Sequence, residues 1–265
     1  MPRQVTAFSN STVKRLRSLR DKKARRSEGL FLAEGLRILA EARDSGQLPE
    51  IVAFSAEGAR HPLAAEIIAA AEAAGGEAIE TTPDILSKMS GKDNPQMLLG
   101  AYRQPSATLD RIDRSKAPLW IVAQALRDPG NIGTILRTGD AVGAGGLILI
   151  DACADPFSVE AVRASMGAIF TQDIATARWA DYVTWLRSGD GQLVGTSLKA
   201  TKDYLDAKYD QPCFLLIGNE QQGLPGEYEA ECDLLVKIPM AGRADSLNAA
   251  MAAAVMAFAI KASWR

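Results

Sequence analysis

Short, uncharged apolar runs recur through the second half of the chain. They cover residues 119–123, 147–150, 193–195, 214–217 and 234–236. An unbroken apolar run of this length is typical of a strand covered on both faces, as strands are in a parallel sheet. Helical patterns separate the runs. The second half therefore predicts a doubly wound α/β/α domain built on a parallel sheet.

The first hundred residues alternate differently and predict a smaller α/β domain. A basic helix is expected over residues 11–25, and apolar residues near helical spacing predict a second helix over 31–42. Two further helices are predicted over 62–74 and 83–90, and two strands over 51–54 and 97–102.

A stretch that is polar, charged and bounded by prolines separates these two patterns. It extends over residues 106–118 and has the composition of a linker between domains. We therefore expect one domain over residues 1–105 and a second over 119–265.

Composition places the chain among ordinary globular proteins. Hydrophobic residues make up 47% and charged residues 23% of its 265 positions. No apolar run is long enough to span a bilayer, and the N-terminal residues carry no apolar signal core. The cysteines Cys153, Cys213 and Cys232 have no close paired spacing, which favours reduced thiols and a cytoplasmic location.

Histidine chemistry is nearly excluded, because His61 is the only histidine. No group of residues has the spacing of a zinc site, so no metal is expected. A serine–histidine–acid triad would need His61 and a nucleophile elbow, which the sequence lacks.

Positive charge is concentrated near the N-terminus, although the formal net charge is −2. From Arg3 to Arg26, nine basic residues stand against one acid, Asp21. Because salt screens charge over about 10 Å, such a local cluster can bind phosphates on a nearly neutral protein. A solvated helix face is the competing interpretation, and the charge alone does not decide between the two.

Three polar segments contain the candidate chemistry, at residues 128–137, 217–224 and 238–248. The glycines of the first segment are wrongly spaced for a dinucleotide-binding loop. Those of the second are followed by Leu224 instead of the lysine of a nucleoside-triphosphate site. Taken singly, each polar residue of these segments could be an exposed charge or a helix cap.

Together and in this order, the three segments resemble the three motifs of the SpoU (TrmH-type) family of RNA ribose methyltransferases. Residues 119–265 are similar to the family's catalytic domain, and residues 1–105 to the RNA substrate-binding domain that many members carry. The resemblance implies transfer of a methyl group from S-adenosylmethionine to a ribose 2′-hydroxyl. It also implies a deep trefoil knot in the second domain, which no pattern in the sequence predicts.

The resemblance assigns functional roles residue by residue. The polar reaction site would comprise Asn131, Arg137, Glu220, Ser246 and Asn248. The cofactor would be held, largely through backbone groups, at Thr196, Gly218, Ile238, Met240 and Leu247. Because arginine stays protonated in proteins, we expect Arg137 to orient groups and stabilise charge, not to remove a proton.

RNA is the expected substrate because DNA lacks the 2′-hydroxyl. The residues expected to contact its phosphates are Lys14, Arg15, Lys22, Lys23, Arg25 and Arg26. The two-domain arrangement resembles enzymes that act on 23S ribosomal RNA. A transfer RNA 2′-O-methyltransferase and a non-catalytic RNA-binding or ribosome-assembly factor are the alternatives.

The last predicted helix, from about residue 246 to 259, is almost wholly apolar and rich in alanine. A helix that is apolar all round belongs in a core or an interface. The family resemblance places a homodimer contact here, with Ala253 and Ala257 as the expected interface residues. A helix buried within one subunit is the competing interpretation.

Overall fold

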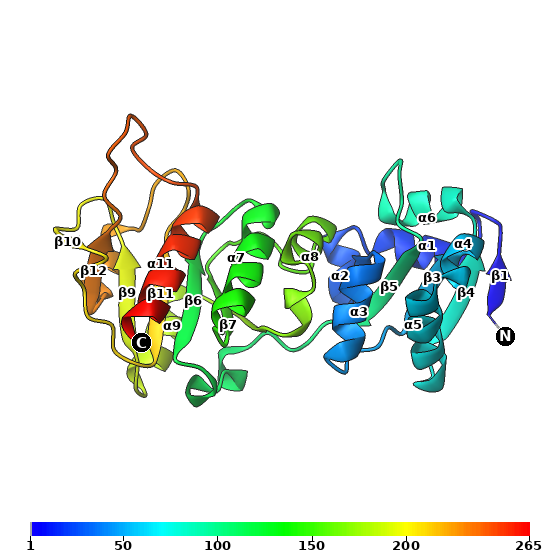
Figure 1. The fold of residues 1–265 in the computed structure, drawn as a ribbon, viewed down its shortest axis with the longest axis horizontal. Helices are drawn as coiled ribbons and strands as arrows, with labels where there is room; N and C mark the ends of the chain where they lie inside the picture. Colours follow the sequence, from blue (N-terminus) through cyan, green and yellow to red (C-terminus); the bar gives the residue numbers. More distant parts are fainter. Residues whose placement is uncertain (1) are drawn as a thin grey trace. The chain divides into compact units, whose positions relative to one another are not determined.

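The computed structural model describes residues 2–265 and divides into two compact units. The first unit comprises the residues up to Pro105 together with Asp155–Thr171, and the second comprises Ser106–Ala154 and Gln172–Arg265. Figure 1 shows the elements in chain order by colour. The segment Asp155–Thr171 thus interrupts the second unit in sequence but packs within the first.

The second unit is built on a seven-stranded sheet whose neighbouring strands are all parallel. In spatial order its strands are β10 (Lys202–Asp203), β12 (Leu234–Lys237), β9 (Gln192–Thr196), β11 (Cys213–Ile217), β6 (Leu119–Gln124), β7 (Gly146–Ile150) and β8 (Asp173–Ala177). Five of them coincide with the apolar runs, so the predicted parallel α/β sheet is confirmed. All residues of β6, β7 and β11 are buried, which explains why their runs are uninterrupted.

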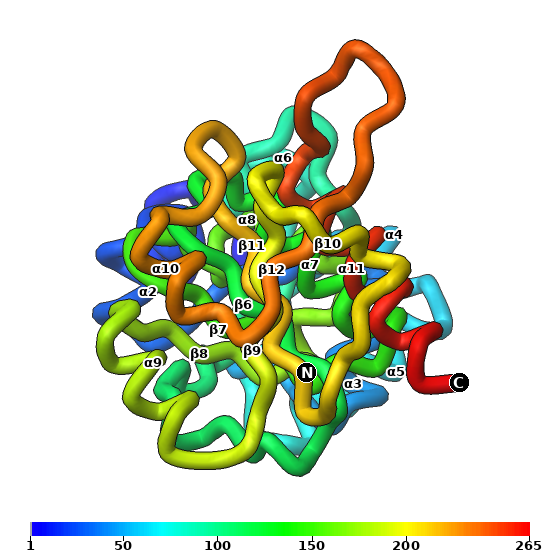
Figure 2. The backbone as a smooth tube through the Cα atoms, turned by 90° about the vertical axis from the view of Figure 1, so that its left-hand side faces the viewer, coloured from blue at the N-terminus to red at the C-terminus, as the bar shows by residue number. Residues whose placement is uncertain are grey.

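Helices cover both faces of this sheet. On one face α7 (Pro129–Val142) and α11 (Ala249–Ser263) pack together against β6 and its neighbours, and on the other lie α9 (Trp179–Arg187) and α10 (Gly226–Glu231). Figure 2 shows the two pairs on opposite sides of the strands. The stretch predicted as a linker holds two 3-10 turns, η1 (Leu109–Arg111) and η2 (Arg114–Lys116), which belong to the second unit.

Two strands of this sheet were not predicted, and both lie at its edges. β8 reads Asp-Ile-Ala-Thr-Ala and leaves Thr176 exposed, while β10 is only two residues long. Edge strands are commonly short and partly polar. They therefore lack the continuous apolar run that identified the central strands.

The first unit contains a five-stranded mixed sheet with helices on both faces. Its strands, in spatial order, are β1 (Arg3–Val5), β4 (Glu77–Thr81), β3 (Ile51–Ser55), β5 (Leu98–Arg103) and β2 (Leu30–Glu34), with β5 antiparallel to both of its neighbours. Its helices are α1 (Ser11–Ser18), α2 (Lys22–Glu28), α3 (Leu36–Asp44), α4 (Ala56–Arg60), α5 (Pro62–Ala73), α6 (Pro83–Ser90) and α8 (Val159–Ser165). The small α/β domain expected from the sequence is therefore present.

Two helices predicted in this unit are wrong in part. The basic helix expected over residues 11–25 is broken into α1 and α2, because Asp21 caps a new helix by accepting the N–H groups of Lys23 and Ala24. The helix expected over 31–42 begins as strand β2, and α3 starts only after Gly35, whose φ is +104°. The apolar residues of β2 are buried on both faces of the sheet, so their spacing carried no periodicity to identify a strand.

Aromatic rings hold the segment Asp155–Thr171 within the first unit. The ring of Phe31 on β2 lies 5.2 Å from that of Phe157 and 5.7 Å from that of Phe170, centroid to centroid. Phe170, in the turn η3 (Ala168–Phe170), also lies 4.7 Å from the ring of Tyr102. Such pairs contribute beyond simple burial, so this segment is part of the first unit's core.

Candidate functional site

A cavity of about 280 Å³ opens at the carboxyl ends of β9, β11 and β12 in the second unit. Its walls come from three loops, at residues 196–199, 217–224 and 237–247. In parallel α/β sheets, ligands bind beyond the carboxyl ends of the strands, because the loops there are free to form a crevice. The second and third loops lie in the polar segments singled out in the sequence.

All five residues predicted to hold the cofactor line this cavity. They are Thr196, Gly218, Ile238, Met240 and Leu247. Apolar side chains such as Ile217 and Leu224 form part of the wall, and the carboxylates of Glu220, Glu229 and Asp245 add acidic groups. Apolar walls with a few placed polar groups are typical of a small-molecule site.

Gly218 allows the loop after β11 to fold back tightly. A β carbon at Gly218 would lie 2.4 Å from the carbonyl carbon of Gly223 and 2.6 Å from the nitrogen of Leu224. Since these are backbone atoms, no side chain can move aside to make room. Only glycine at position 218 is therefore compatible with this shape of the cavity wall.

Asn219 organises the same loop and was not identified from the sequence. Its side-chain oxygen accepts the backbone N–H groups of Gln221 and Gln222, at 3.0 and 3.3 Å, while its amide nitrogen donates to the carbonyl of Ala125, at 2.8 Å. An asparagine that bonds to backbone two residues ahead is a recognised turn signal. The run Asn219-Glu220-Gln221-Gln222-Gly223 contains that signal, so local turn chemistry could have found this residue.

Three residues predicted for the reaction site, one from each polar segment, form a continuous chain of hydrogen bonds. The amide nitrogen of Asn248 donates to the side-chain oxygen of Asn131 at 3.1 Å, and the amide nitrogen of Asn131 donates to Glu220 Oε1 at 2.9 Å. Asn219 completes the chain with a longer contact to Glu220 Oε2, at 3.5 Å. The structure thus joins positions 131, 220 and 248 beside the cavity.

The N-terminal ends of two helices hold the hydrogen-bonded residues Asn131, Glu220 and Asn248 in place. Asp128 caps α7 through the N–H groups of Gly130 and Asn131, and Asn248 caps α11 through those of Ala250 and Met251. The positive ends of both helices therefore lie close to the Glu220 carboxylate, which they favour. Asn248, not Ser246, is the cap of the last helix.

Ser246 lies in the cavity wall and donates its hydroxyl hydrogen to the carboxylate of Asp245, at 3.2 Å. The structure therefore brings four of the five predicted reaction-site residues to one place.

Arg137 is the exception. It is exposed on α7 and lies outside the cavity wall, and its side chain makes no hydrogen bond or ion pair with any residue of the described chain. It follows Asn131 by six residues, so the two side chains point about 120° apart around the helix. A single copy of the chain does not bring Arg137 to the other four residues.

The basic residues predicted to contact RNA are not equivalent. Lys14, Lys22, Lys23 and Arg26 are exposed, whereas Arg15 is exposed but pairs with Glu28 at 2.8 Å. The prediction for Arg25 is wrong, because only 3% of its surface is exposed. Its guanidinium is occupied by the carboxylate of Asp155 and by two backbone carbonyls.

Metal and thiol chemistry receive no support from the described residues. They hold no group of three histidine, cysteine or carboxylate side chains that could bind a metal. All three cysteines are unpaired, and burial raises the pKa of Cys153 to about 11, so its thiol stays protonated at neutral pH. Within residues 2–265, no helix has the length and apolar character needed to cross a membrane.

The chain matches two family models. Residues 118–258 match the SpoU rRNA Methylase family, and residues 10–100 match the MRM3-like substrate binding domain. Among curated proteins, the chain is 33% identical over 246 residues to the 23S rRNA (uridine(2479)-2′-O)-methyltransferase of Streptomyces viridochromogenes, covering 90% of this chain and 84% of that protein. It is 28% identical over 259 residues to the 23S rRNA (guanosine(2553)-2′-O)-methyltransferase RlmP of Bacillus subtilis, covering 98% and 99%.

Solved structures give the same result. The AdoMet-bound rRNA methyltransferase from Sinorhizobium meliloti superimposes with a TM-score of 0.91 and 39% identity, covering 98% of this chain and 97% of that one. The similarity includes both units of the chain, and the matched region contains all three polar segments. The chain therefore belongs to the SpoU rRNA methylase family.

Proposed function

We propose that this protein transfers a methyl group from S-adenosylmethionine to a ribose 2′-hydroxyl of 23S ribosomal RNA. The observation that carries the proposal is the hydrogen-bonded chain of Asn131, Glu220 and Asn248 at the rim of a small-molecule cavity. Two relatives that are 23S rRNA 2′-O-methyltransferases support the substrate class.

The cavity suits S-adenosylmethionine in size and in chemistry. A volume of about 280 Å³ lies near the lower end of small-molecule sites. The carboxylates of Glu220, Glu229 and Asp245 complement a ligand that carries positive charge on a sulfonium. When bound, the cofactor supplies an activated methyl group, and Gly218, Ile238 and Leu247 hold it through their backbone and apolar surfaces.

The polar residues act by placing the ribose. Asn131 and Asn248 fix the Glu220 carboxylate, and Ser246 lies in the same wall, so the attacking hydroxyl can be held in one orientation. Correct positioning alone can lower a barrier by ~7–11 kcal/mol in favourable systems. As the ribose oxygen takes the methyl group, the S–CH3 bond breaks, S-adenosylhomocysteine leaves and the hydroxyl proton passes to water or to an RNA phosphate. Arg137 stabilises the negative charge that develops on the ribose oxygen.

An exposed apolar stripe on α11 supports a homodimer. Its members lie three or four residues apart on one helix face, and they are Leu247 just before the helix, Met251, Val255 and Phe258. A symmetric contact through this face covers apolar surface on both copies at once. This dimer contact would also lie beside α7, because α7 packs against α11. Arg137 of each copy could then reach the partner's cavity.

The prediction that Ala253 and Ala257 lie in the dimer interface is wrong. Ala253 and Ala257 are fully buried inside their own subunit, because they face α7 and the sheet. The exposed stripe occupies the opposite face of the same helix. The alanine face of α11 is therefore buried within one subunit, as the competing interpretation expected, and only the opposite face is available for a dimer contact.

We also infer a knotted C-terminal segment and a cytoplasmic protein. The chain leaves β11, passes outside β9 to form β12, and returns through residues 238–248 so that α11 lies against β11 and β6 (Figure 2). Near the C-terminus the indole N–H of Trp264 donates to the carbonyl of Tyr209, in the connection between β10 and β11. This path supports a trefoil knot.

The cytoplasmic location is supported by the proposed ribosomal RNA substrate and by the three unpaired cysteines.

Cofactor binding and product analysis test the proposed function. Titration calorimetry is expected to show binding of S-adenosylmethionine in the presence of a metal chelator, and incubation with 23S rRNA is expected to yield a 2′-O-methylated nucleoside. A base-methylated nucleoside, or methylation of transfer RNA alone, would replace the proposed reaction. Cofactor binding without methyl transfer to either RNA would favour a non-catalytic role.

Replacing Gly218 with alanine is expected to weaken S-adenosylmethionine binding by at least about tenfold. The added β carbon would collide with backbone atoms of Gly223 and Leu224, so the wall of the cavity must shift. Gly226→Ala is the matched control, because a β carbon at Gly226 meets no atom within 4 Å. Equal calorimetric affinities for the two variants would remove Gly218 from the cofactor site.

A further inference from the structure

The turn between α1 and α2 carries a shallow basic groove in the first unit. The groove is lined by Lys14, Arg17, Ser18, Arg20 and Asp21. The side chains of all five are exposed, and three of them are cations. Helix α1 presents this face to water because its apolar residues Val13 and Leu16 point into the core.

The positive charge of the groove is not neutralised within the described chain. Within residues 2–265, none of Lys14, Arg17 and Arg20 forms an ion pair, whereas Arg15 on α1 pairs with Glu28. The single acid, Asp21, is already occupied as the cap of α2, where Oδ1 accepts two backbone N–H groups at 2.8 and 3.3 Å. Three free cations thus surround one engaged carboxylate.

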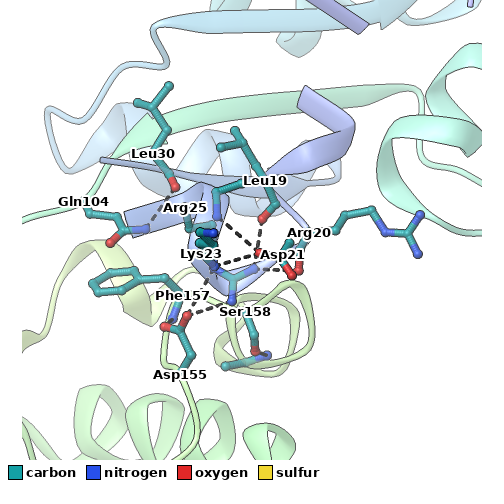
Figure 3. Close-up of polar contacts among 12 residues, drawn as sticks. Leu19, Arg20, Asp21, Lys23, Arg25, Leu30, Gln104, Asp155, Phe157 and Ser158 are labelled. Carbon is teal, nitrogen blue, oxygen red and sulfur yellow. Dashed lines mark hydrogen bonds and ion pairs between the residues drawn. The ribbon is translucent and has the colours of Figure 1, made fainter. Parts of the chain in front are cut away.

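Buried Arg25 fixes the shape of the turn that carries this charge. One guanidinium nitrogen donates to the carbonyls of Leu19 and Arg20, at 2.9 and 2.8 Å, and the others donate to Asp155 Oδ2, at 2.7 and 3.2 Å (Figure 3). The carbonyls at the end of a helix otherwise lack partners inside the protein. Arg25 satisfies two carbonyls of the turn that follows α1, while Asp155 balances its charge.

The side chain of Arg20 is seated against a glycine. A β carbon at Gly91 would lie 2.2 Å from the central carbon of the Arg20 guanidinium, so any larger residue there would displace it. Gly91 has a φ of +77° and ends α6, which packs against α1. The Arg20 guanidinium therefore lies over Gly91, at the end of α6.

We propose that this groove is the subsite that binds backbone phosphates of the RNA substrate, with Lys14, Arg17 and Arg20 as its contacts. Arg25 is a positioning residue that acts through Arg20. The proposal rests on the proposed function for the identity of the RNA, and it replaces Arg15 and Arg25 by Arg17 and Arg20 among the expected contacts. Phosphates suit the site because arginine and lysine supply several donors, while the one carboxylate of the groove caps α2.

The double variant Arg17→Gln/Arg20→Gln tests the contacts in the full-length protein. Binding to a protein-free 23S rRNA transcript is measured by filter retention over a series of salt concentrations. Affinity is expected to fall about tenfold at moderate salt, and the slope of log affinity against log salt is expected to become less steep by about two. The affinity for S-adenosylmethionine is expected to stay unchanged.

Arg37→Gln/Arg60→Gln is the matched control, since it removes the same charge from exposed positions elsewhere in the first unit. The control is expected to change the salt slope by much less. If both double variants reduce the slope equally, or if neither does, the groove is not the phosphate subsite. If the wild-type protein transfers no methyl group to RNA, but Arg17→Gln/Arg20→Gln still weakens RNA binding as expected, only the proposed function is overturned.

A double-mutant cycle tests the role of Arg25. Arg25→Lys keeps the charge but cannot donate in a planar fork to two carbonyls and a carboxylate. It is expected to raise the KM for RNA severalfold with kcat unchanged, and this effect is expected to disappear in an Arg20→Gln background. Additive effects of the two substitutions would show that Arg25 does not act through Arg20, and circular dichroism identifies a variant that has simply unfolded.

Discussion

Replacing Arg137 with alanine is expected to lower kcat for methyl transfer by at least about 10²- to 10³-fold, the range observed when one charge-stabilising donor is removed from an active site. S-Adenosylmethionine should still bind within a few fold of the wild-type affinity, because Arg137 lies outside the cavity wall. Transfer of a labelled methyl group to 23S rRNA gives the rate, and calorimetry gives the affinity.

Arg137→Lys distinguishes charge from shape at the same position. Lysine keeps the positive charge but lacks the planar set of donors that can hold two oxygens at once. We therefore expect this variant to remain severely impaired. Near-normal turnover by either variant would show that Arg137 takes no part in the reaction, whatever the family resemblance implies.

The double variant Met251→Asp/Phe258→Asp is expected to dissociate the dimer and to lower methyl transfer by at least about tenfold. The two side chains are 60% and 56% exposed in the single chain, so aspartate can be accepted there without disturbing the fold. In a symmetric contact each charge would be buried without a partner in both copies. Light scattering reports the mass, and single-turnover kinetics report the reaction.

Phe8→Asp provides the control for that experiment. Phe8 is 55% exposed and belongs to the first unit, whereas α11 belongs to the second. This variant is expected to retain the mass and activity of the wild type. A wild-type protein that is monomeric and fully active at assay concentration would exclude both the dimer and the exchange of Arg137 between copies.

Mixing two inactive proteins offers a sharper test of that exchange. If Arg137 serves the partner's cavity, Arg137→Ala and Glu220→Gln chains combined in one dimer contain one intact site. Partial activity is then expected to return after mixing under conditions that allow subunits to exchange. No recovery, despite a mixed dimer detected by mass spectrometry, would mean that each chain uses its own arginine.

The sequence was most informative where one local rule determined the outcome. Continuous apolar runs identified the buried strands, and the order of those strands placed residues 196, 218 and 238 at one edge of the sheet. The assignment of individual side chains there came from the family resemblance. The hydrogen bonds that join Asn131, Glu220 and Asn248 depend on segments far apart in the chain, so no periodicity could have predicted them.

The sequence was least informative where a residue's type does not decide its environment. Arg25 has the composition of a surface residue, yet Asp155, 130 positions away, makes its burial possible. Ala253 and Ala257 are small enough for either a core or an interface, and the helix pattern was apolar all round. Which face of that helix lies inward is decided by its packing against α7 and the sheet.

The packing of Phe157 and Phe170 limits where this protein can be cut into separate domain fragments. Both rings pack on Phe31 from an excursion of the chain that lies within the family-matched methylase region. A fragment starting at residue 106 would keep the two phenyl rings but lose the surface that shelters them from water. A fragment ending at residue 105 would lose the Asp155 counter-ion and leave the Arg25 guanidinium without its acid. A single cut at residue 105 therefore leaves both fragments with an incomplete core. The two domains can be exchanged between relatives only if residues 155–171 are transferred together with the N-terminal domain.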